Sequence, residues 1–167
     1  MLITDSSALR EWHDRTRVRR PALPSNQLEA LERLTILVPT RDRQDFLIRL
    51  VAVWGGTPVR LVLIDGSDHS VSATHREVIE SAENVCYLHS PVSYVERLKL
   101  AASYVSTPYA VTSGDDEFLL PAGLAAAIRA LDQDPGLAGC VGQSLRFFPT
   151  RRRQRLMFEM GYPYWRY

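Results

Sequence analysis

The chain has 167 residues, of which 46% are hydrophobic and 23% are charged, and its formal net charge is +1. These values are typical of a single folded domain with a hydrophobic core, and so small a net charge argues against bulk attraction to nucleic acid or anionic membranes. The sequence contains no run of roughly 20 apolar residues that could span a bilayer, and its first residues lack the apolar stretch of a secretory signal.

The cysteines and histidines set further limits on compartment and metal content. Cys86 and Cys140 both lie in apolar sequence. This predicts reduced core cysteines of a cytoplasmic protein rather than a disulfide framework. The four histidines share no zinc-type spacing with one another or with the cysteines, so a structural zinc site is not expected.

Residues 1–33 have a mixed character and precede the first clear strand signal. Residues 6–20 are expected to form a short helix, and residues 21–27, with prolines at 21 and 24, read as a linker. From Leu34 the pattern changes to a continuous apolar, β-branched run, which predicts a strand buried on both faces.

From this point predicted strands and helices alternate through short connections. Strands are expected at 34–39, 59–65, 85–90 and 108–113, helices at 42–54, 70–82, 92–106 and 122–134, and a fifth strand or a hairpin within 136–148. Such alternation predicts βαβ units and a mainly parallel sheet flanked by helices. We therefore expect an α/β, Rossmann-like domain over residues 34–148, preceded by a helix and linker at 1–33 and followed by a basic and aromatic segment at 149–167.

Charged residues follow three of the predicted strands directly. Thr40-Arg41-Asp42 follow the first strand, Asp65-Gly66-Ser67-Asp68 the second, and Asp115-Asp116-Glu117 the fourth. Ligands of open α/β sheets bind beyond the carboxyl ends of the strands. We therefore expect these residues to gather around a ligand at one edge of the sheet.

Three interpretations of the acidic triplet 115–117 stay open: a solvated turn, a helix N-terminus that favours negative charge, and a bound cation. Two carboxylates about 4 Å apart repel each other by roughly 4 kcal/mol at an effective dielectric near 20. A divalent cation reverses the sign of this interaction, and oxygen ligands suit magnesium or manganese. The cation is the favoured interpretation. For Asp65, the simpler alternative is a turn residue that caps local backbone N–H groups.

Motifs for several other functions are absent from the sequence. The first predicted strand is not followed by G-x-G-x-x-G, and the chain has no G-K-[ST] phosphate loop. The segment "GQSLR" lacks the second glycine of a nucleophile elbow. These absences disfavour a nicotinamide-binding domain, a P-loop enzyme and an α/β-hydrolase.

Three segments, "LTILVPTRDRQDFL", "VRLVLIDGSD" and "YAVTSGDDEFLLPAGL", resemble the nucleotide-binding half of GT-A glycosyltransferases, above all the large inverting family 2. That family has Pro-Thr-x-Asn-Arg after the first strand, Asp-Asp-Gly-Ser after the second, and Asp-x-Asp-Asp before apolar-Leu-Pro. The resemblance covers residues 34 to 143. The chain departs from the pattern at four positions, which are Asp42, Ile64, Gly114 and Glu117.

The resemblance implies roles for the residues at the strand ends. Pro39 and Thr40 would lie against the nucleotide base, with Arg41 beside them, and Asp65 would hydrogen-bond that base. Asp115 would face the ribose or the sugar.

The resemblance also implies a metal ion and a basic residue. Asp116 would bind the Mn²⁺ or Mg²⁺ ion that bridges the diphosphate, and the neighbouring Glu117 is the second candidate ligand. Arg97 corresponds to a basic residue that reaches the nucleotide, and an exposed helix charge is the alternative interpretation. The helix that carries Arg97 is expected to bury Val95, Leu98, Ala102 and Val105.

The activity implied by the resemblance is transfer of a sugar with inversion from a nucleotide sugar, most commonly a UDP-sugar, to a carbohydrate or lipid-linked acceptor. It would take place in the cytoplasm or at the inner membrane surface, without a nucleic acid partner. Inversion requires a general base, which in this family is an acid many residues beyond the metal motif. Glu159 is the only acid after Asp134, so the base is expected outside this chain.

Three further expectations concern the ending of the sequence and the rival functions. Exposed apolar residues in 157–167 predict a homo-oligomer or poor solubility. A chain of this length would be the donor-binding half of a longer protein or would act with a partner. The alternatives are a catalytically silent nucleotide-sugar-binding module and, less favoured, a phosphate-handling α/β enzyme that uses the same acids for magnesium.

Overall fold

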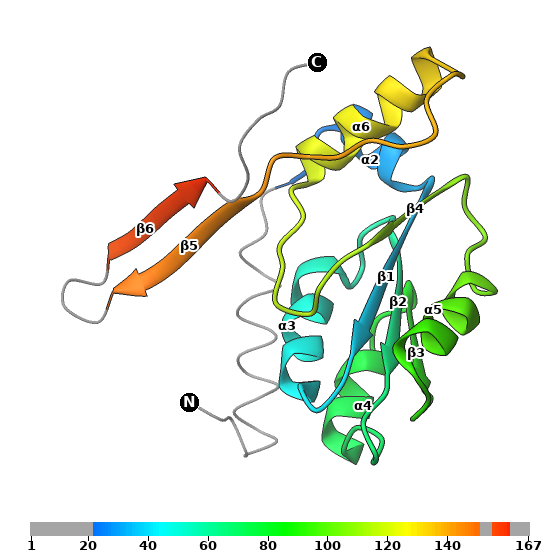
Figure 1. Cartoon of the computed structure of the whole chain (residues 1–167), viewed down its shortest axis with the longest axis vertical. Helices are drawn as coiled ribbons and strands as arrows, with labels where there is room; N and C mark the ends of the chain where they lie inside the picture. The colour runs from blue at the N-terminus through cyan, green and yellow to red at the C-terminus, as the bar shows by residue number, and fades with distance from the viewer. Residues whose placement is uncertain (1–21, 151–154, 161–167) are drawn as a thin grey trace. The chain divides into compact units, whose positions relative to one another are not determined.

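Strands and helices alternate along the chain as the sequence predicts, in a computed structural model that describes residues 22–150 and 155–160 (Figure 1). The elements are, in order, α2 (Ser25–Leu31), β1 (Leu34–Thr40), α3 (Gln44–Trp54), β2 (Arg60–Asp65), α4 (Ala73–Glu80), β3 (Val85–His89), α5 (Tyr94–Ala102), β4 (Tyr109–Thr112), α6 (Pro121–Gln133), β5 (Leu145–Thr150) and β6 (Arg155–Met160). The four strands and four helices predicted between residues 34 and 134 are all confirmed, with ends that differ by a few residues.

The prediction of a linker at 21–27 is wrong for its last three residues, which open α2. A proline disrupts the interior of a helix, but Pro24 stands just before the first turn, where a missing N–H costs nothing. The short helix expected at 6–20 lies outside the described residues.

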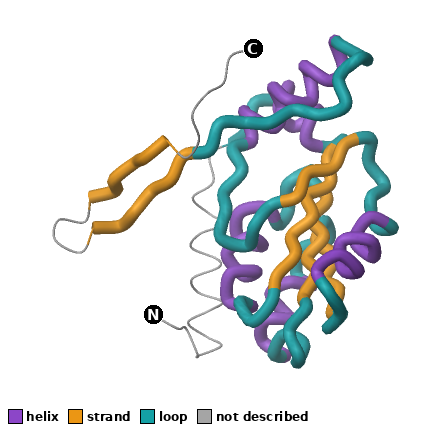
Figure 2. Tube along the Cα trace, viewed as in Figure 1, coloured by secondary structure: helices purple, strands orange, loops and turns teal. Residues whose placement is uncertain are grey.

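Four parallel strands form one sheet in the order β3-β2-β1-β4, and Figure 2 shows them side by side. Thr40 pairs with Asp65, and Asp65 pairs with His89, so three strands end level with one another. The shorter β4 ends opposite Leu37, and the backbone N–H of Ser113 continues along β1 by donating to the Leu37 carbonyl at 3.0 Å. The Rossmann-like α/β fold with a parallel sheet is therefore confirmed.

Helices cover both faces of this sheet. Ala101 of α5 packs with Leu37, Val62 and Ile64 on one face. Cys86 and Leu88 of β3 pack on this same face. Because successive strand residues point to opposite faces, Tyr87 between them points to the other face, where its ring lies against Arg76 of α4. The helix α3 contacts α4 and lies on the same side (Figure 1).

The central strands are buried on both faces, as their apolar runs predict. Ile36 and Val38 of β1 are 1% and 0% exposed, and Leu61 to Ile64 of β2 are fully buried. From the second face, α3 contributes Leu47 and Val51, both fully buried. The apolar interior thus ends where the strands end, and the polar residues begin there.

The predicted buried face of the helix at 92–106 is wrong at Val95 and Ala102, whereas Leu98 is half-buried and Val105, which follows α5, packs against the core. In α5 the buried residues are Arg97 and Ala101, whereas Val95 is 60% exposed and Ala102 is also exposed. The cap at Ser93 sets where the helix begins, and the small Ala101 fits against the sheet. The aliphatic stem of Arg97 adds apolar contact on this side, while its guanidinium reaches the polar residues at the carboxyl ends of the strands. We call this polar edge, with Thr40, Asp65 and Asp115, the rim.

The chain divides into two compact units, Met1–Ala125 and Ala126–Tyr167, and the parallel sheet belongs to the first. In the second unit, β5 and β6 pair antiparallel. Of the strand or hairpin expected within 136–148, only residues 145–148 form a strand, the start of β5, and its partner β6 lies beyond the expected range. The expected domain boundary at residue 148 stays a prediction. Residues 151–154 and 161–167 of the basic and aromatic segment lie outside the described residues.

The two cysteines are free, and one of them is not a core residue. Cys86 is partly buried on β3, but Cys140 is exposed, so its prediction as a core residue is wrong. Residues 134–144 contain no helix or strand, so the apolar residues around Cys140 do not form one side of a regular element that could pack on a core. Within the described part of the chain, none of the helices has both the length and the apolar content that crossing a bilayer requires.

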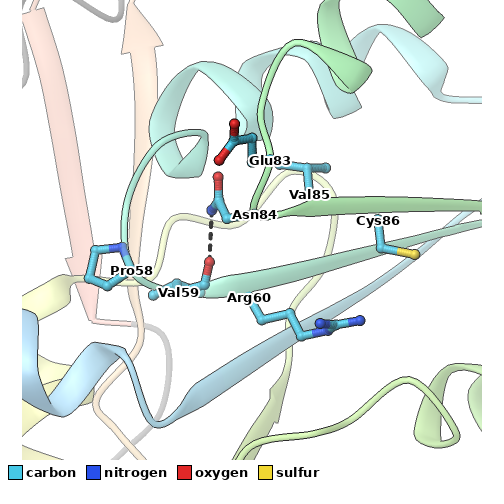
Figure 3. A pocket seen from close by; sticks show the side chains of 7 residues that line it. All are labelled: Pro58, Val59, Arg60, Glu83, Asn84, Val85 and Cys86. Atoms are coloured by element: carbon cyan, nitrogen blue, oxygen red, sulfur yellow. Dashed lines mark hydrogen bonds between the residues drawn. The ribbon is translucent and has the colours of Figure 1, made fainter.

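A cavity of about 250 Å³ lies at the amino ends of β2 and β3, the edge opposite the strand ends considered below (Figure 3). Asn84 organises it: its Nδ2 donates to the carbonyls of Trp54 (2.9 Å) and Val59 (2.7 Å), and its Oδ1 accepts from Gly56 N–H at 2.7 Å. These bonds tie the connection between α3 and β2 to the start of β3.

Candidate functional site at the carboxyl edge of the sheet

Asp65, the last residue of β2, is fully buried and accepts four hydrogen bonds. Its Oδ1 accepts from Ser67 N–H (2.9 Å) and Ser67 Oγ (2.5 Å), and its Oδ2 accepts from Gln44 Nε2 (2.7 Å) and the Tyr87 hydroxyl (2.8 Å). The turn role weighed for Asp65 is therefore present. Its bonds also hold the loop after β2 to α3 and β3, while contact with a nucleotide base stays a prediction.

Tyr87 shares in this network from β3. Its hydroxyl donates to Asp65 and accepts from Val71 N–H at 3.1 Å. Burial, reinforced by the bond to Asp65, raises the pKa of Tyr87 to about 12. The neutral hydroxyl is thus kept as a permanent donor to the buried carboxylate.

Thr40, the last residue of β1, connects two oppositely charged side chains. Its Oγ1 donates to Asp115 Oδ2 at 2.6 Å. Its carbonyl accepts from Gly66 N–H at 2.9 Å and from Nη1 of Arg97. One threonine therefore joins the loops after β1, β2 and β4 to helix α5.

Arg97 is 5% exposed, so the alternative that it is an exposed helix charge is wrong. Its guanidinium lies directly over Gly66, and its centre is 5.9 Å from the Tyr94 ring. Among the described residues no carboxylate forms an ion pair with it, and its Nε is buried without a hydrogen-bond partner. A buried positive charge in this state is costly unless an anion compensates it.

Asp115 and Asp116 lie together on one guanidinium, that of Arg43. Nη2 of Arg43 is 3.2 Å from Asp115 Oδ1 and 2.8 Å from Asp116 Oδ2. The hydrogen bond from Arg43 lowers the pKa of Asp116 below its ordinary value, and the two acids in turn raise the pKa of Arg43. The acidic pair is thus folded against a cation that the chain itself supplies.

The loop after β1 bends sharply at Asp42, which has a φ of 56°. Asn and Asp are among the few residues that adopt this left-handed conformation readily. The backbone N–H of Asp42 donates to Ser67 Oγ at 2.8 Å, which attaches this loop to the loop after β2. Arg41 lies 3.6 Å from Asp42 and from Asp68, both at the exposed surface.

Two residues predicted for the site have other surroundings. Pro39 lies within β1, opposite Ile64 of β2. Glu117 accepts a hydrogen bond from Gly114 N–H at 2.8 Å and closes a tight turn. The roles implied for them, contact with the base and binding of a metal, stay predictions.

A cavity of about 530 Å³ opens between the loops after β1 and β2. It is lined by Asp42, Arg43, Gln44, Asp45, Phe46, Ser67, Asp68 and His69. Its lining contains hydrogen-bond donors, acceptors and the Phe46 ring, which is the mixture that a polar ligand with a flat ring requires.

Neither a protein-family model nor a curated protein matches this sequence. The site therefore has to be understood from its own chemistry. Within residues 22–150 and 155–160, no group of three or more His, Cys, Asp and Glu side chains is arranged to hold a metal ion. Asp115 and Asp116 nevertheless supply neighbouring carboxylate oxygens, which suit magnesium or manganese if Arg43 moves.

The expectation that site residues gather beyond the strand ends correctly places Thr40, Asp65 and Asp115 at one edge of the sheet, but it does not identify the side chains that bond to them. Thr40, Arg97 and Asp115 form one connected group, to which Asp116 is joined through Arg43. The residues not predicted are Arg43, Gln44 and Tyr87, while Ser67 was expected at this edge without a defined role. Arg43 directly follows the segment 40–42, so its position is a signal that could have identified it, whereas Tyr87 carries no sequence signal of this role.

Proposed function

We propose that this rim binds the diphosphate of a nucleotide sugar and that the protein is the donor-binding part of an inverting glycosyltransferase. The observation that carries the proposal is the buried Arg97, which has no carboxylate partner among the described residues and lies next to the Thr40–Asp115 pair at the carboxyl edge of a parallel sheet. A buried guanidinium facing this edge suits an anionic group, and α/β sheets bind nucleotides there.

Each part of the rim has a function in this proposal. Arg97 attracts the diphosphate, and the cavity beside Phe46 receives the nucleoside. Asp115 and Asp116 hold a divalent cation, Mn²⁺ or Mg²⁺, whose charge would stabilise the departing diphosphate. The donor is a nucleotide sugar, with a UDP-sugar as the first to test, and the acceptor is a carbohydrate or a lipid-linked sugar.

A single titration series tests the proposal. Thermal unfolding is recorded with a panel of UDP- and GDP-sugars, each with and without manganese, and we expect stabilisation by at least one donor that depends on the metal. Asp116→Asn should abolish the metal-dependent part, because it removes an exposed ligand carboxylate. Glu80→Gln, at a similarly exposed acid on α4 that does not line this cavity, is the matched control. Unchanged melting in every combination would exclude the proposal.

The hydrogen bonding of the acids favours a second candidate, a module that binds a nucleotide sugar without turnover. Asp65 accepts four bonds, Glu117 closes its own turn, and Asp115 and Asp116 pair with Arg43. None of these carboxylates is positioned as a free general base. Release of nucleoside diphosphate, measured with and without sugar acceptors, separates the two: binding without release favours the module.

A further inference from the structure

The guanidinium of Arg43 contacts the carboxylate oxygens that a bound cation would need. Nη2 lies within 3.2 Å of both Asp115 and Asp116. One positive charge stands against two negative ones, so the group keeps a net charge of −1 and still attracts a cation. The guanidinium and a divalent ion repel each other, however, and cannot share the same carboxylate oxygens.

Arg43 is held less firmly than Asp115. Its side chain is 42% exposed, and in the same conformation its guanidinium lies 4.3 Å from the centre of the Phe46 ring, a contact that it can keep when the ion pairs break. Asp115 is 7% exposed and is fixed by the 2.6 Å bond from Thr40. A cation arriving at the rim would therefore displace the arginine more readily than Asp115.

The rim carries an independent sign of an anionic ligand. Arg97 is buried, reaches the carbonyl of Thr40 with Nη1, and leaves Nε without a partner among the described residues. Thr40 is also the residue that binds Asp115. An anion drawn to Arg97 thus arrives beside the two acids, and it brings negative charge that favours both the cation and a displaced Arg43.

We propose that Arg43 is an exchangeable counter-ion, which neutralises Asp115 and Asp116 in the ligand-free protein and yields them to a divalent cation when a nucleoside diphosphate binds. This inference rests on the function proposed above and adds an order of events to it. Without the diphosphate, the cation competes with Arg43 and binds weakly. With the diphosphate, the competition is relieved and the cation binds tightly.

Calorimetric titration tests this order with manganese alone and with manganese in the presence of saturating UDP or GDP. Arg43→Met should bind manganese alone about tenfold more tightly than the unaltered protein, because the competing charge is gone. Adding UDP or GDP should bring the unaltered protein close to the affinity of the variant. Arg49→Met is the matched control, since its guanidinium lies 3.8 Å from the same Phe46 ring without an ion pair to the acids.

Each other outcome is decisive. Equal manganese affinity in the unaltered protein and Arg43→Met would overturn the inference and leave the cation site in place. An equal gain in Arg49→Met would also overturn it, because general loss of positive charge would then explain the effect. Failure of every protein to bind manganese, with and without nucleotide, would overturn the cation site itself. Circular dichroism establishes folding, and Arg43→Gln replaces any Arg43→Met that does not fold.

Discussion

The guanidinium of Arg97 fills the space in which a side chain on Gly66 would begin. A Cβ atom at Gly66 would lie 2.4 Å from Cζ of Arg97 and 2.5 Å from its Nη1. Gly66 does not have a left-handed backbone, so the need for glycine here comes from this neighbour and not from the turn. The absence of one side chain is thus what admits a buried positive charge to the rim.

The first prediction concerns this contact. Gly66→Ala should lower the free energy of unfolding by about 1–3 kcal/mol, because the new methyl group displaces a buried guanidinium from its bond to Thr40. In an Arg97→Ala background the same change should cost at least about 1 kcal/mol less, since the clash no longer exists. Urea denaturation of the four proteins in this cycle provides the measurement.

A glycine without neighbours serves as the control for that cycle. Gly123 in α6 has no heavy atom within 4 Å of its expected Cβ position, so Gly123→Ala should stabilise the protein by about 0.5–1 kcal/mol. Additive costs of Gly66→Ala and Arg97→Ala would contradict the proposed contact.

The second prediction concerns the hydrogen bonds to Asp65. Asp65→Asn should cost about 2–4 kcal/mol of stability, because an amide N–H₂ group would face two donors where a carboxylate oxygen accepts from both. Asp68→Asn, at an exposed position three residues later, should change stability by no more than about 0.5 kcal/mol. Chemical denaturation compares the pair, and equal effects would show that the network contributes nothing.

The third prediction concerns the titration of Tyr87. Because its pKa is raised to about 12, the folded protein keeps this hydroxyl neutral where an unfolded chain ionises near pH 10. Its contribution to stability is complete below pH 10 and is lost as the pH rises from 10 to 12. The difference in tyrosinate absorbance between the unaltered protein and Tyr87→Phe gives the titration. A titration midpoint near pH 10 for Tyr87 in this difference would refute its buried bond to Asp65.

The fourth prediction concerns Asp116 and its partner. Arg43→Gln should raise the pKa of Asp116 toward its ordinary value of 3.8, because the hydrogen bond from Arg43 is the main cause of its lowering. The stabilisation linked to this lowered pKa is present above 3.8 and disappears as the pH falls through the folded-state value. Carboxyl NMR titration measures the change. Arg49→Gln, which acts only through a more distant charge, should leave the pKa nearly unchanged.

The fifth prediction concerns the opposite edge of the sheet, in the region of Figure 3. Asn84→Ala should cost about 2–3 kcal/mol, because it removes the side-chain donor of the Val59 carbonyl, one of the two side-chain donors of the Trp54 carbonyl and the acceptor of Gly56 N–H. Glu83→Ala, at an exposed residue lining the same cavity, should lie within about 0.5 kcal/mol of the unaltered protein. Thermal unfolding measures the stability of both variants. Equal losses in Asn84→Ala and Glu83→Ala would show that Asn84 does not organise this edge.

The sheet and its rim follow from local sequence because their signals are local. Runs such as 36–39 and 61–64 are apolar at every position, which is typical of a strand buried on both faces. Parallel pairing then places Thr40 and Asp65 level with each other, and the residues after β4 beside them. The prediction of clustered polar residues at this edge therefore needed no knowledge of individual contacts.

The partners of those residues depend on features that sequence patterns do not carry. The direction of Arg43 follows from the left-handed turn at Asp42, which is a property of the folded backbone. The burial of Arg97 depends on the rotation of α5, where apolar spacing pointed to Val95 instead. The apolar spacing misled because a long side chain can pack with its stem while its charge serves the rim.

The bonds of the rim are made by residues at or just beyond the strand ends together with Tyr87 and Arg97, while the side chains of Leu61, Leu63 and Val38 contribute packing alone. The interior of the sheet and the rim can therefore be mutagenised separately. Directed evolution for heat resistance can draw on the interior of the sheet without rescreening every variant for ligand affinity. Under the proposed function, variation for new donor specificity can be confined to the loops after β1 and β2.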